Sequence, residues 1–390
     1  MLTDGFWGAG FRTLLMLIGI DIRRSGDFGV GTYIRNLVTA LGRMGPEEEY
    51  VLIGRRGQFE DLGELGPRFR SCIYARPYDA WQSHLDFDPV IRRLGLDILH
   101  MPHRWIPYRC TGPYVVTLHD LNNILFPGQA SAAKQALQRH MLVRGLGRAA
   151  RVIAVSEATK RDAVKLLGLR ADLFDVAPAA VDPRVAEPVT EGERERILSR
   201  YQIGDPFVLY AGRIQEHKNL PRLIEAFAVV KSELENDPRY KKLGLILIGD
   251  EITALPEVRH AVMRARIQPW VRFLGFVPLG TLRVFYATAS AFLFPSLYEG
   301  FGLPPLEAMA HGTPVVASNV SSLPEVLGDA AVLVNPKNVF DIARGLREVL
   351  VDDALREELR VRGQRRTLSY SWDESARKVL EIYRQVTAPG

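Results

Sequence analysis

Short apolar runs alternate along this chain with stretches in which apolar residues recur every three or four positions. Residues 14–20 form a continuous apolar run, which is typical of a strand covered on both faces of a parallel sheet. The next stretch has helical spacing, with Ile34, Leu37, Val38 and Leu41 on one side. The same order recurs in the first half, where we predict strands at 50–53, 97–99, 114–118 and 152–155 and a helix at 132–146. This alternation predicts a parallel α/β sheet.

A change in the pattern near residues 181–191 divides the chain into two halves. Asp182-Pro183, Glu187-Pro188 and the charged run 191–196 interrupt the alternation, so we place a domain boundary there. Strands are predicted again at 207–210, 244–248, 272–274, 291–294, 314–317 and 331–334. We expect one domain at 1–187, a second at 188–370 and a helical segment at 371–390. Two open sheets that face each other make a cleft, with ligands beyond the carboxyl ends of the strands.

The composition fits two such domains. A length of 390 residues exceeds one ordinary core, and 47% hydrophobic with 24% charged residues is typical of a globular chain. These values exclude a collagen, a disordered tail and a small disulfide scaffold. The formal net charge of +5 suits an anionic small molecule or the edge of an anionic membrane. It is too small to indicate a nucleic-acid partner, and none is expected.

The cysteines and the early apolar run indicate a cytoplasmic protein. Cys72 and Cys110 cannot build a disulfide framework, which suits a reducing compartment. The run at 14–20 is too short to cross a bilayer, which needs about 20 apolar residues. Residues 1–11 have no charged start or cleavage site of a signal peptide, and we interpret them as a loose leader.

The most informative stretch follows the strand predicted to end at Phe294. A loop carries Glu299, and two prolines suit the first turn of a helix, in which we place Glu307. Glycines allow backbone N–H groups to approach a ligand, and a helix N-terminus favours phosphate. Carboxylates accept hydrogen bonds from sugar hydroxyls. The stretch could therefore hold a phosphate and two polyols, unless Glu307 only supports the helix start and Glu299 is solvated.

Two further loops after predicted strands carry candidate phosphate-binding groups. Arg213 and Lys218 flank a loop after the strand at 207–210, with Asn219 as a plausible helix N-cap. Fixed cations there could stabilise a departing diphosphate, although a surface Arg and Lys are equally common. The first strand is followed by a glycine loop that contains Gly29 and Gly31 and opens a helix, an arrangement suited to anions. It lacks the lysine pattern of a P-loop.

The segment YEGFGLPPLEAMAHGTPVVAS closely resembles the signature of retaining nucleotide-sugar glycosyltransferases of family 4, which have the two-domain GT-B fold. The resemblance implies two facing Rossmann-like domains with an interdomain cleft. It also implies that Glu299 contacts the donor sugar and that Glu307 binds the ribose hydroxyls. The segment between them, Phe301, Gly302 and Leu303, would then lie on the sugar and diphosphate.

The resemblance extends to other loops. YAGR followed by HKN is similar to the family's phosphate loop, which assigns the diphosphate to Arg213 and Lys218. The glycine loop, with Gly29 and Gly31 followed by Tyr33, is similar to a G-x-G-x-Y pattern that contacts the diphosphate near the acceptor. His119, after the strand at 114–118, would touch the donor sugar near its 6-hydroxyl. Val277 lies in a loop expected against the nucleobase, and the last helix would cross back to the first domain.

These observations predict a metal-independent retaining hexosyltransferase with no cofactor besides its nucleotide-sugar donor. GDP-mannose is favoured over UDP-glucose, because the glycine loop and the segment at His119 resemble bacterial mannosyltransferases of surface polysaccharide. The acceptor is expected to be a sugar or a lipid-linked molecule, the latter with a peripheral contact at the inner face of the membrane. Alternatives are an epimerase or a pyridoxal-phosphate phosphorylase of the same fold, or a regulator that binds sugar nucleotides without transfer.

No metal site is predicted. His100 and His103 have no cysteine or carboxylate cluster beside them, and Asp86 and Asp88, just before Pro89, are interpreted as loop residues. The first half also contains aromatic residues that could stack on an acceptor sugar, although core packing is the simpler interpretation; these are Trp81, Trp105 and Tyr108.

Overall fold

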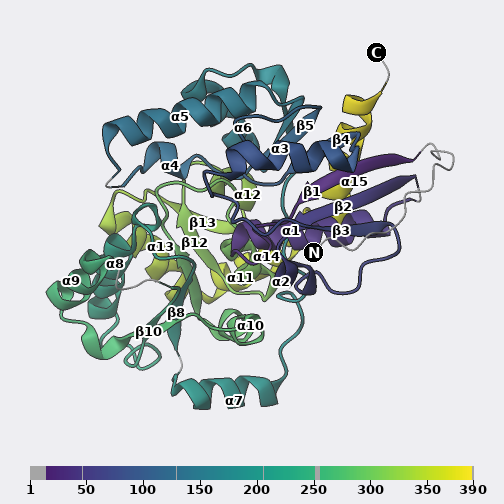
Figure 1. The fold of residues 1–390 in the computed structure, drawn as a ribbon. Helices are drawn as coiled ribbons and strands as arrows, with labels where there is room; N and C mark the ends of the chain where they lie inside the picture. Colours follow the sequence, from purple (N-terminus) through teal and green to yellow (C-terminus); the bar gives the residue numbers. More distant parts are fainter. Residues whose placement is uncertain (1–14, 46, 129, 205, 251–254, 389–390) are drawn as a thin grey trace.

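The computed structural model describes residues 15–45, 47–128, 130–204, 206–250 and 255–388 and contains two parallel sheets (Figure 1). The first has the strand order β3-β2-β1-β4-β5-β6-β7. Its strands are β1 (Met16–Asp21), β2 (Glu48–Gly54), β3 (Phe69–Ile73), β4 (Ile98–Met101), β5 (Tyr114–Leu118), β6 (Arg151–Ala154) and β7 (Phe174–Val176). Its helices are α1 (Gly29–Arg43), α2 (Arg56–Glu60), α3 (Ser83–Leu94), α4 (Asn122–Leu125), α5 (Ala132–Gly147) and α6 (Glu157–Leu167).

The second sheet has the order β10-β9-β8-β11-β12-β13. Its strands are β8 (Phe207–Ala211), β9 (Gly244–Ile248), β10 (Val271–Gly275), β11 (Ala291–Phe294), β12 (Val315–Ser318) and β13 (Ala331–Val334). The helices of this half are α7 (Glu191–Tyr201), α8 (Leu220–Glu233), α9 (Pro256–Ala265), α10 (Leu279–Thr288), α11 (Leu303–Ala310), α12 (Leu323–Leu327), α13 (Val339–Val351) and α14 (Asp353–Thr367). The expected fold, two parallel-sheet α/β domains, is confirmed.

The last helix, α15 (Trp372–Thr387), packs against α1 of the first domain. The Trp372 indole N–H donates to the carbonyl of Val181 at 3.1 Å. Near its other end, Arg384 forms an ion pair with the buried carboxylate of Glu48 at 2.6 Å. The chain therefore returns from the second sheet to the first, as the ribbon shows (Figure 1).

Several predicted elements need correction. β3 and β7 were not predicted, because β3 is a largely exposed edge strand without an apolar run and β7 has only three residues. The charged run at 191–196 is not a break but the start of α7, where Thr190 and Glu193 form a capping box. The leader at 1–11 and the start of the first apolar run lie outside the described residues.

Asp86 and Asp88 lie within α3 rather than in a loop, with Pro89 inside the same helix. Both carboxylates are occupied by protein partners: Asp86 accepts from the Tyr74 hydroxyl, and Asp88 accepts from the backbone and hydroxyl of Thr111 at 2.6 and 2.8 Å. These contacts tie α3 to neighbouring loops. The two aspartates therefore have a structural part in the first domain.

Candidate active site

The loop after β11 meets the first domain at Gly300. A Cβ atom at this position would lie 1.6 Å from the carbonyl oxygen of His119, which follows β5. The Gly300 carbonyl accepts hydrogen bonds from the hydroxyls of Ser156 at 2.7 Å and Thr159 at 3.0 Å, at the start of α6. Glycine is thus required here by the close approach of the two domains. This contact places the Glu299 loop and His119 next to each other.

Lys218 and Glu299 form an ion pair, with the ammonium nitrogen 2.6 Å from Oε1. Lys218 ends the short 3₁₀ turn Glu216–Lys218 after β8, and Glu299 lies after the neighbouring strand β11. Their side chains are only 12% and 9% exposed, so solvent screens the pair little. The ammonium also lies 5.1 Å from the centre of the Phe294 ring. Two residues predicted from separate motifs therefore meet in one site.

Two serines after β12 hold the Glu299 loop, and the sequence analysis missed both. The backbone N–H of Glu299 donates to Ser321 Oγ at 2.9 Å. The buried hydroxyl of Ser322 lies 2.9 Å from the carbonyl oxygen of Glu299 and 3.0 Å from that of Phe301. The two carbonyls share this one hydroxyl as their hydrogen-bond donor. Their position after a predicted strand of the same sheet was the signal that could have revealed them.

Glu307 lies in the second turn of α11, not in the first as predicted. The helix begins at Leu303, after Gly302 at a φ of 104°, a backbone conformation that favours glycine. Glu307 Oε2 accepts a hydrogen bond from the buried Tyr286 hydroxyl at 2.9 Å. Burial raises the pKa of Glu307 to about 7, although the Tyr286 hydroxyl opposes this shift. The carboxyl group therefore changes charge near neutral pH.

Arg213 is more exposed to solvent than Lys218 and Glu299. Its side chain is 43% exposed, and Nε is 3.8 Å from Asp250 Oδ2. Its guanidinium also lies 5.6 Å from the ring centre of Phe28, a residue of the glycine loop in the first domain. Phe28 in turn makes an edge contact with Phe276 at 5.9 Å. Arg213 therefore faces the first domain at the point where the glycine loop approaches.

The loop predicted against the nucleobase presents Phe276 rather than Val277. The Val277 side chain is buried in the core, whereas the Phe276 ring is 66% exposed. Phe301 is also buried and contacts Tyr370 edge-on at 5.4 Å. The side chains of Val277 and Phe301 are therefore packed in the core and not exposed to a ligand. Asn219 precedes α8, but its amide donates to the carbonyls of Pro295 and Pro336 instead of capping the helix.

The two predicted glycines of the first domain have different surroundings. Gly29 is the first residue of α1 and is exposed, and a Cβ there would meet no atom within 4 Å. Gly31 is buried, and its Cβ would lie 2.3 Å from the carbonyl oxygen of Ser25. Gly31 therefore lets the loop fold back on the helix. Gly29 leaves open space at the helix N-terminus, where an anion is favoured.

His119 is held by the first domain on one side of its ring. Nε2 lies 3.0 Å from the carbonyl oxygen of Pro102, and the Tyr33 ring contacts the His119 ring edge-on at 4.8 Å. A carbonyl only accepts, so Nε2 carries the proton. Burial lowers the pKa of His119 to about 4, which keeps the ring neutral at pH 7. Its Nδ1 is then a hydrogen-bond acceptor, suited to a hydroxyl group.

A buried polar chain connects Tyr33 to the last helix. Thr117 Oγ1 lies 3.4 Å from the Tyr33 hydroxyl and 2.7 Å from Nε2 of His100. Nδ1 of His100 is 2.5 Å from the Tyr383 hydroxyl on α15. Burial lowers the pKa of His100 to about 3, so this ring is neutral. The chain fixes the packing behind His119.

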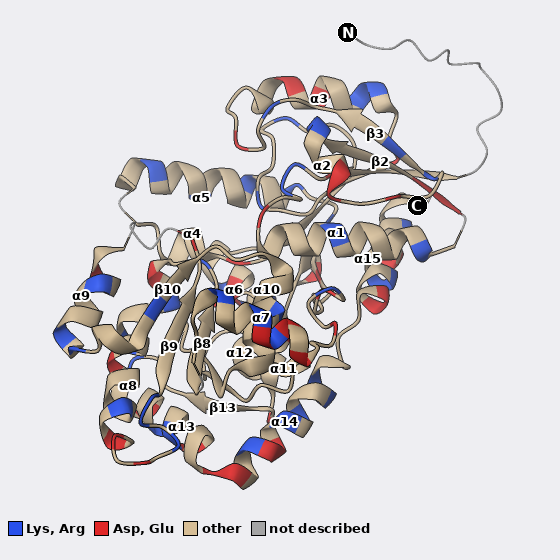
Figure 2. Ribbon diagram, turned by 90° about the horizontal axis from the view of Figure 1, so that it is seen from below, with Lys and Arg blue, Asp and Glu red and all other residues tan. Residues whose placement is uncertain are grey.

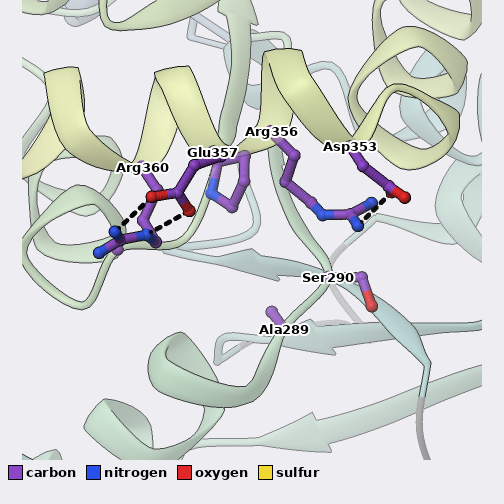
Figure 3. A pocket seen from close by; sticks show the side chains of 8 residues that line it. Ala289, Ser290, Asp353, Arg356, Glu357 and Arg360 are labelled. Atoms are coloured by element: carbon purple, nitrogen blue, oxygen red, sulfur yellow. Dashed lines mark hydrogen bonds and ion pairs between the residues drawn. The ribbon is translucent and has the colours of Figure 1, made fainter.

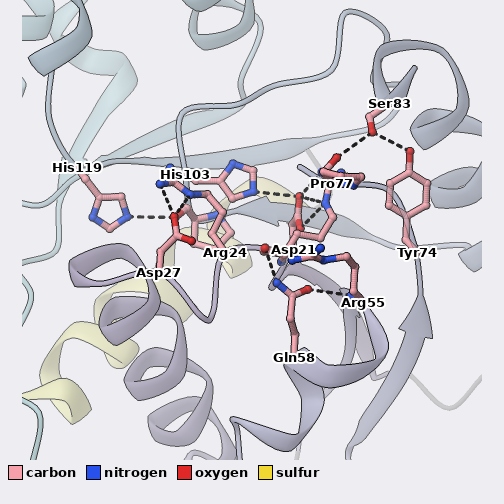
Figure 4. Close-up of polar contacts among 12 residues, drawn as sticks. Asp21, Arg24, Asp27, Arg55, Gln58, Tyr74, Pro77, Ser83, His103 and His119 are labelled. Carbon is pink, nitrogen blue, oxygen red and sulfur yellow. Dashed lines mark hydrogen bonds and ion pairs between the residues drawn. The ribbon is translucent and has the colours of Figure 1, made fainter. Parts of the chain in front are cut away.

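His103 belongs to a different cluster from His100. It lies 3.0 Å from a carboxylate oxygen of Asp21, which also pairs with Arg23 at 2.6 Å, and all three are fully buried (Figure 4). Burial alone would raise the pKa of Asp21, but Arg23 and His103 lower it well below its ordinary value. Within the described ranges, no three or more His, Cys, Asp or Glu side chains are placed to hold a metal ion.

The aromatic candidates for acceptor stacking also differ. Trp105 covers the buried Arg23 guanidinium at 4.8 Å and is part of the packing. Trp81 is 66% exposed, and Tyr108 lies under the Arg144 guanidinium at 3.8 Å. Among the described residues, no hydrogen bond, ion pair or ring contact joins Trp81 or Tyr108 to Glu299, Lys218 or His119.

A recess of about 340 Å³ lies elsewhere, between α14 and the residues that precede β11 and β12 (Figure 3). Its two arginines are already paired on α14: Arg356 with Asp353 and Arg360 with Glu357, both at 2.5 Å. It opens at the amino ends of the strands, whereas ligands in such sheets bind at the carboxyl ends. The candidate site is therefore the junction of the Glu299, Lys218 and His119 loops.

Comparisons with known proteins identify the family of the chain. The family descriptions Glycosyltransferase Family 4 and Glycosyl transferases group 1 match residues 29–185 and 193–366. The chain is 32% identical over 288 residues to the O-antigen chain mannosyltransferase B of Escherichia coli. The aligned region covers 74% of each of the two chains. The chain belongs to the glycosyltransferases. This glycosyltransferase is a hexosyltransferase of the group 1 and family 4 type, as the resemblance implied.

Solved structures confirm the GT-B fold of this glycosyltransferase. Sucrose-phosphate synthase from Thermosynechococcus elongatus superposes with a TM-score of 0.75 at 21% identity, over 96% of this chain and 99% of that one. HepE from Anabaena, in complex with UDP and glucose, gives a TM-score of 0.72 at 19% identity over 94% and 98%. At these identities the likeness concerns the fold alone.

Proposed function

We propose that this glycosyltransferase is a retaining, metal-independent mannosyltransferase that uses GDP-mannose and acts on a sugar or lipid-linked acceptor in polysaccharide or glycoconjugate biosynthesis. The observation that carries the proposal is the shielded Lys218–Glu299 pair beside His119. The sugar is inferred from the mannosyltransferase relative and from the glycine loop. UDP-glucose is the second candidate donor.

The proposed reaction relies on electrostatics and positioning. As the bond between the sugar and the diphosphate breaks, negative charge grows on the leaving oxygen. Lys218 and Arg213 would stabilise that charge, and cations already fixed by the protein do so with little reorganisation. Glu299 would orient the sugar through its hydroxyl groups, so that the acceptor oxygen meets the anomeric carbon on the face from which the diphosphate leaves. The acceptor hydroxyl would pass its proton to the departing diphosphate oxygen as the new C–O bond forms. No divalent metal is needed in this scheme.

The remaining groups would hold the two ends of the donor. Glu307, when ionised, would accept hydrogen bonds from the ribose hydroxyls, and Nδ1 of the neutral His119 would accept one from the sugar. Gly29 and the backbone from Phe301 to Leu303 would lie along the diphosphate, and the Val277 loop along the base. These contacts separate donor recognition from the charge stabilisation by Lys218.

The proposal can be tested by incubating the full chain with GDP-mannose, UDP-glucose and related nucleotide sugars and measuring released nucleoside diphosphate. A thermal-shift series with the same compounds identifies the donor that binds, because ligand binding raises apparent stability. The proposal is supported if the wild-type chain releases GDP from GDP-mannose and the Glu299→Gln variant does not. Binding with no release under any acceptor would favour the sugar-nucleotide-binding regulator, and conversion of the sugar without an acceptor would favour an epimerase.

A lipid-linked acceptor would bring the enzyme to the inner face of the membrane. None of the helices in the described ranges is both long and apolar enough to span a bilayer. For the described residues, the proposed contact with the membrane is therefore a peripheral one. Comparing transfer to soluble sugars with transfer to lipid-linked sugars in detergent decides between the two acceptor classes.

A further inference from the structure

Helix α6 of the first domain begins against a carboxylate of the second domain. Glu325 lies on α12, and its Oε1 and Oε2 accept hydrogen bonds from the backbone N–H groups of Glu157 and Ala158, at 2.8 and 2.9 Å. These are the first two residues of α6, and their N–H groups have no partner within the helix. A side chain of one domain therefore caps a helix of the other, where α6 and α12 lie next to each other (Figure 2).

The same turn of α6 also holds the loop that carries Glu299. The Ser156 hydroxyl accepts the backbone N–H of Thr159 at 3.0 Å and donates to the carbonyl of Gly300 at 2.7 Å. The Thr159 hydroxyl donates to the same carbonyl at 3.0 Å. The first turn of α6 is thus bound to the second domain at two places, which are the Gly300 carbonyl and the Glu325 carboxylate.

Helix α12 is attached to the Glu299 loop through the two serines before it. Ser322 donates to the carbonyl of Glu299, and Ser321 accepts the backbone N–H of Glu299, both at 2.9 Å. On α14, Arg366 donates to the carbonyl of Glu325 at 2.6 Å and supports α12. The Glu299 loop, α12 and α6 therefore form a closed ring of hydrogen bonds, in which Glu325 joins α12 to α6.

We propose that Glu325 is a positioning residue for sugar transfer, because its cap on α6 fixes the Glu299 loop against His119. Both carboxylate oxygens are occupied by backbone N–H groups, so Glu325 acts through α6 and not on a substrate. Hydrogen bonds to an ionised acceptor are stronger than neutral ones, and a helix N-terminus favours a negative charge. The inference rests on the roles proposed above for Glu299 and His119.

The first test separates kcat from donor binding in the full chain. Glu325→Ala should lower kcat with GDP-mannose about tenfold or more, because a displacement of ~1 Å can cost about 10²-fold in rate. Affinity for GDP, measured by calorimetry, should stay within about twofold of wild type, because Lys218 and Glu307 remain in place. Glu325→Gln keeps the length of the side chain but has one accepting oxygen instead of two, so its kcat should lie between those of Glu325→Ala and wild type.

The second test does not depend on activity. Hydrogen exchange followed by mass spectrometry, without substrate, should show faster exchange in Glu325→Ala for the peptides that cover residues 156–160 and 299–303. The N–H groups at the start of α6 lose a charged acceptor, so their exchange should accelerate about tenfold or more. The loop at 299–303 should follow, because α6 holds its Gly300 carbonyl.

The matched control is Glu358→Ala, which removes a carboxylate that pairs with Arg362 on the same helix, α14. This control should keep the kcat and the exchange rates of wild type. The proposal is overturned if Glu325→Ala lowers the melting temperature but keeps the wild-type kcat per folded molecule, or if exchange at 156–160 and 299–303 does not change. Absence of release by wild type with every nucleotide sugar would instead contradict the proposed function, whereas the exchange result concerns Glu325 alone.

Discussion

Glu299 Oε1 and Lys218 Nζ lie 2.6 Å apart, and each residue follows a neighbouring strand of the second sheet. Without a donor, the two charges neutralise each other in a largely buried place, which avoids the cost of an isolated buried ion. A bound diphosphate would offer Lys218 a second anion, and a bound sugar would offer Glu299 hydroxyl donors. The pair therefore keeps both groups positioned before the substrate arrives.

Lys218→Ala should lower kcat/KM by about 10²–10³, because it removes a preorganised charge contact to the developing diphosphate charge. Affinity for the intact donor, measured by calorimetry, should fall by less than this. Lys241→Ala, an exposed cation outside the site, serves as the control. Turnover of Lys218→Ala within a few-fold of wild type, with normal folding, would remove Lys218 from the mechanism.

Activity should be unchanged by excess chelator. The proposed cations at the diphosphate are Arg213 and Lys218, and a chelator removes neither. The measurement is nucleoside diphosphate release after dialysis against EDTA, with and without added magnesium or manganese. Loss of release that either metal restores would show that a divalent ion takes part in the reaction.

Donor affinity should fall as the pH is lowered from 8 to 6. Glu307, with a pKa of about 7, becomes protonated over this range and then accepts hydrogen bonds from ribose less well. Calorimetry with GDP-mannose at several pH values measures this effect. Glu307→Gln should bind more weakly at pH 8 and show a flatter pH profile, and a wild-type profile without slope would contradict the role of Glu307.

The same group predicts how stability depends on pH. The pKa of Glu307 is raised above the unfolded value of 4.5 to about 7. The contribution of Glu307 to the free energy of unfolding is therefore fully present below pH 4.5 and is lost as the pH rises through 7. Glu307→Gln should therefore stabilise the fold at pH 8 relative to pH 5, by on the order of 1–3 kcal/mol. Urea unfolding of both proteins at the two pH values checks the sign.

Gly300→Ala should impair activity by displacing the two domains where they meet. Its Cβ would lie 1.6 Å from the His119 carbonyl oxygen, so the backbone of one domain must move. We expect a lower melting temperature and a kcat reduced at least tenfold. Gly192→Ala, on α7 with no atom within 4 Å of the added carbon, should leave kcat unchanged and should not lower the melting temperature, because alanine favours the helix more than glycine does. Equal behaviour of the two variants would show that the contact does not matter.

The sequence by itself determined the fold class and indicated the residues of the candidate site. Continuous apolar runs marked buried strands such as β9 and β11, because a strand covered on both faces disfavours polar side chains. It also indicated Glu299, Glu307, Arg213, Lys218 and His119, since each lies at or beyond the carboxyl end of a predicted strand. Exposed or very short strands, β3 and β7, have no such run and could not be recognised.

Only the tertiary structure decided which of these groups meet. Lys218 and Glu299 are 81 residues apart, and their contact depends on the order of β8 and β11 in the sheet. Nothing in the sequence around Ser321 and Ser322 distinguishes them from other polar residues. Only the fold brings them into hydrogen-bond contact with the Glu299 loop. Gly300 looks like a flexible loop residue, but its need for glycine comes from the carbonyl of His119 in the other domain. Local patterns report burial and periodicity, whereas contacts between distant segments arise only when both sheets are assembled.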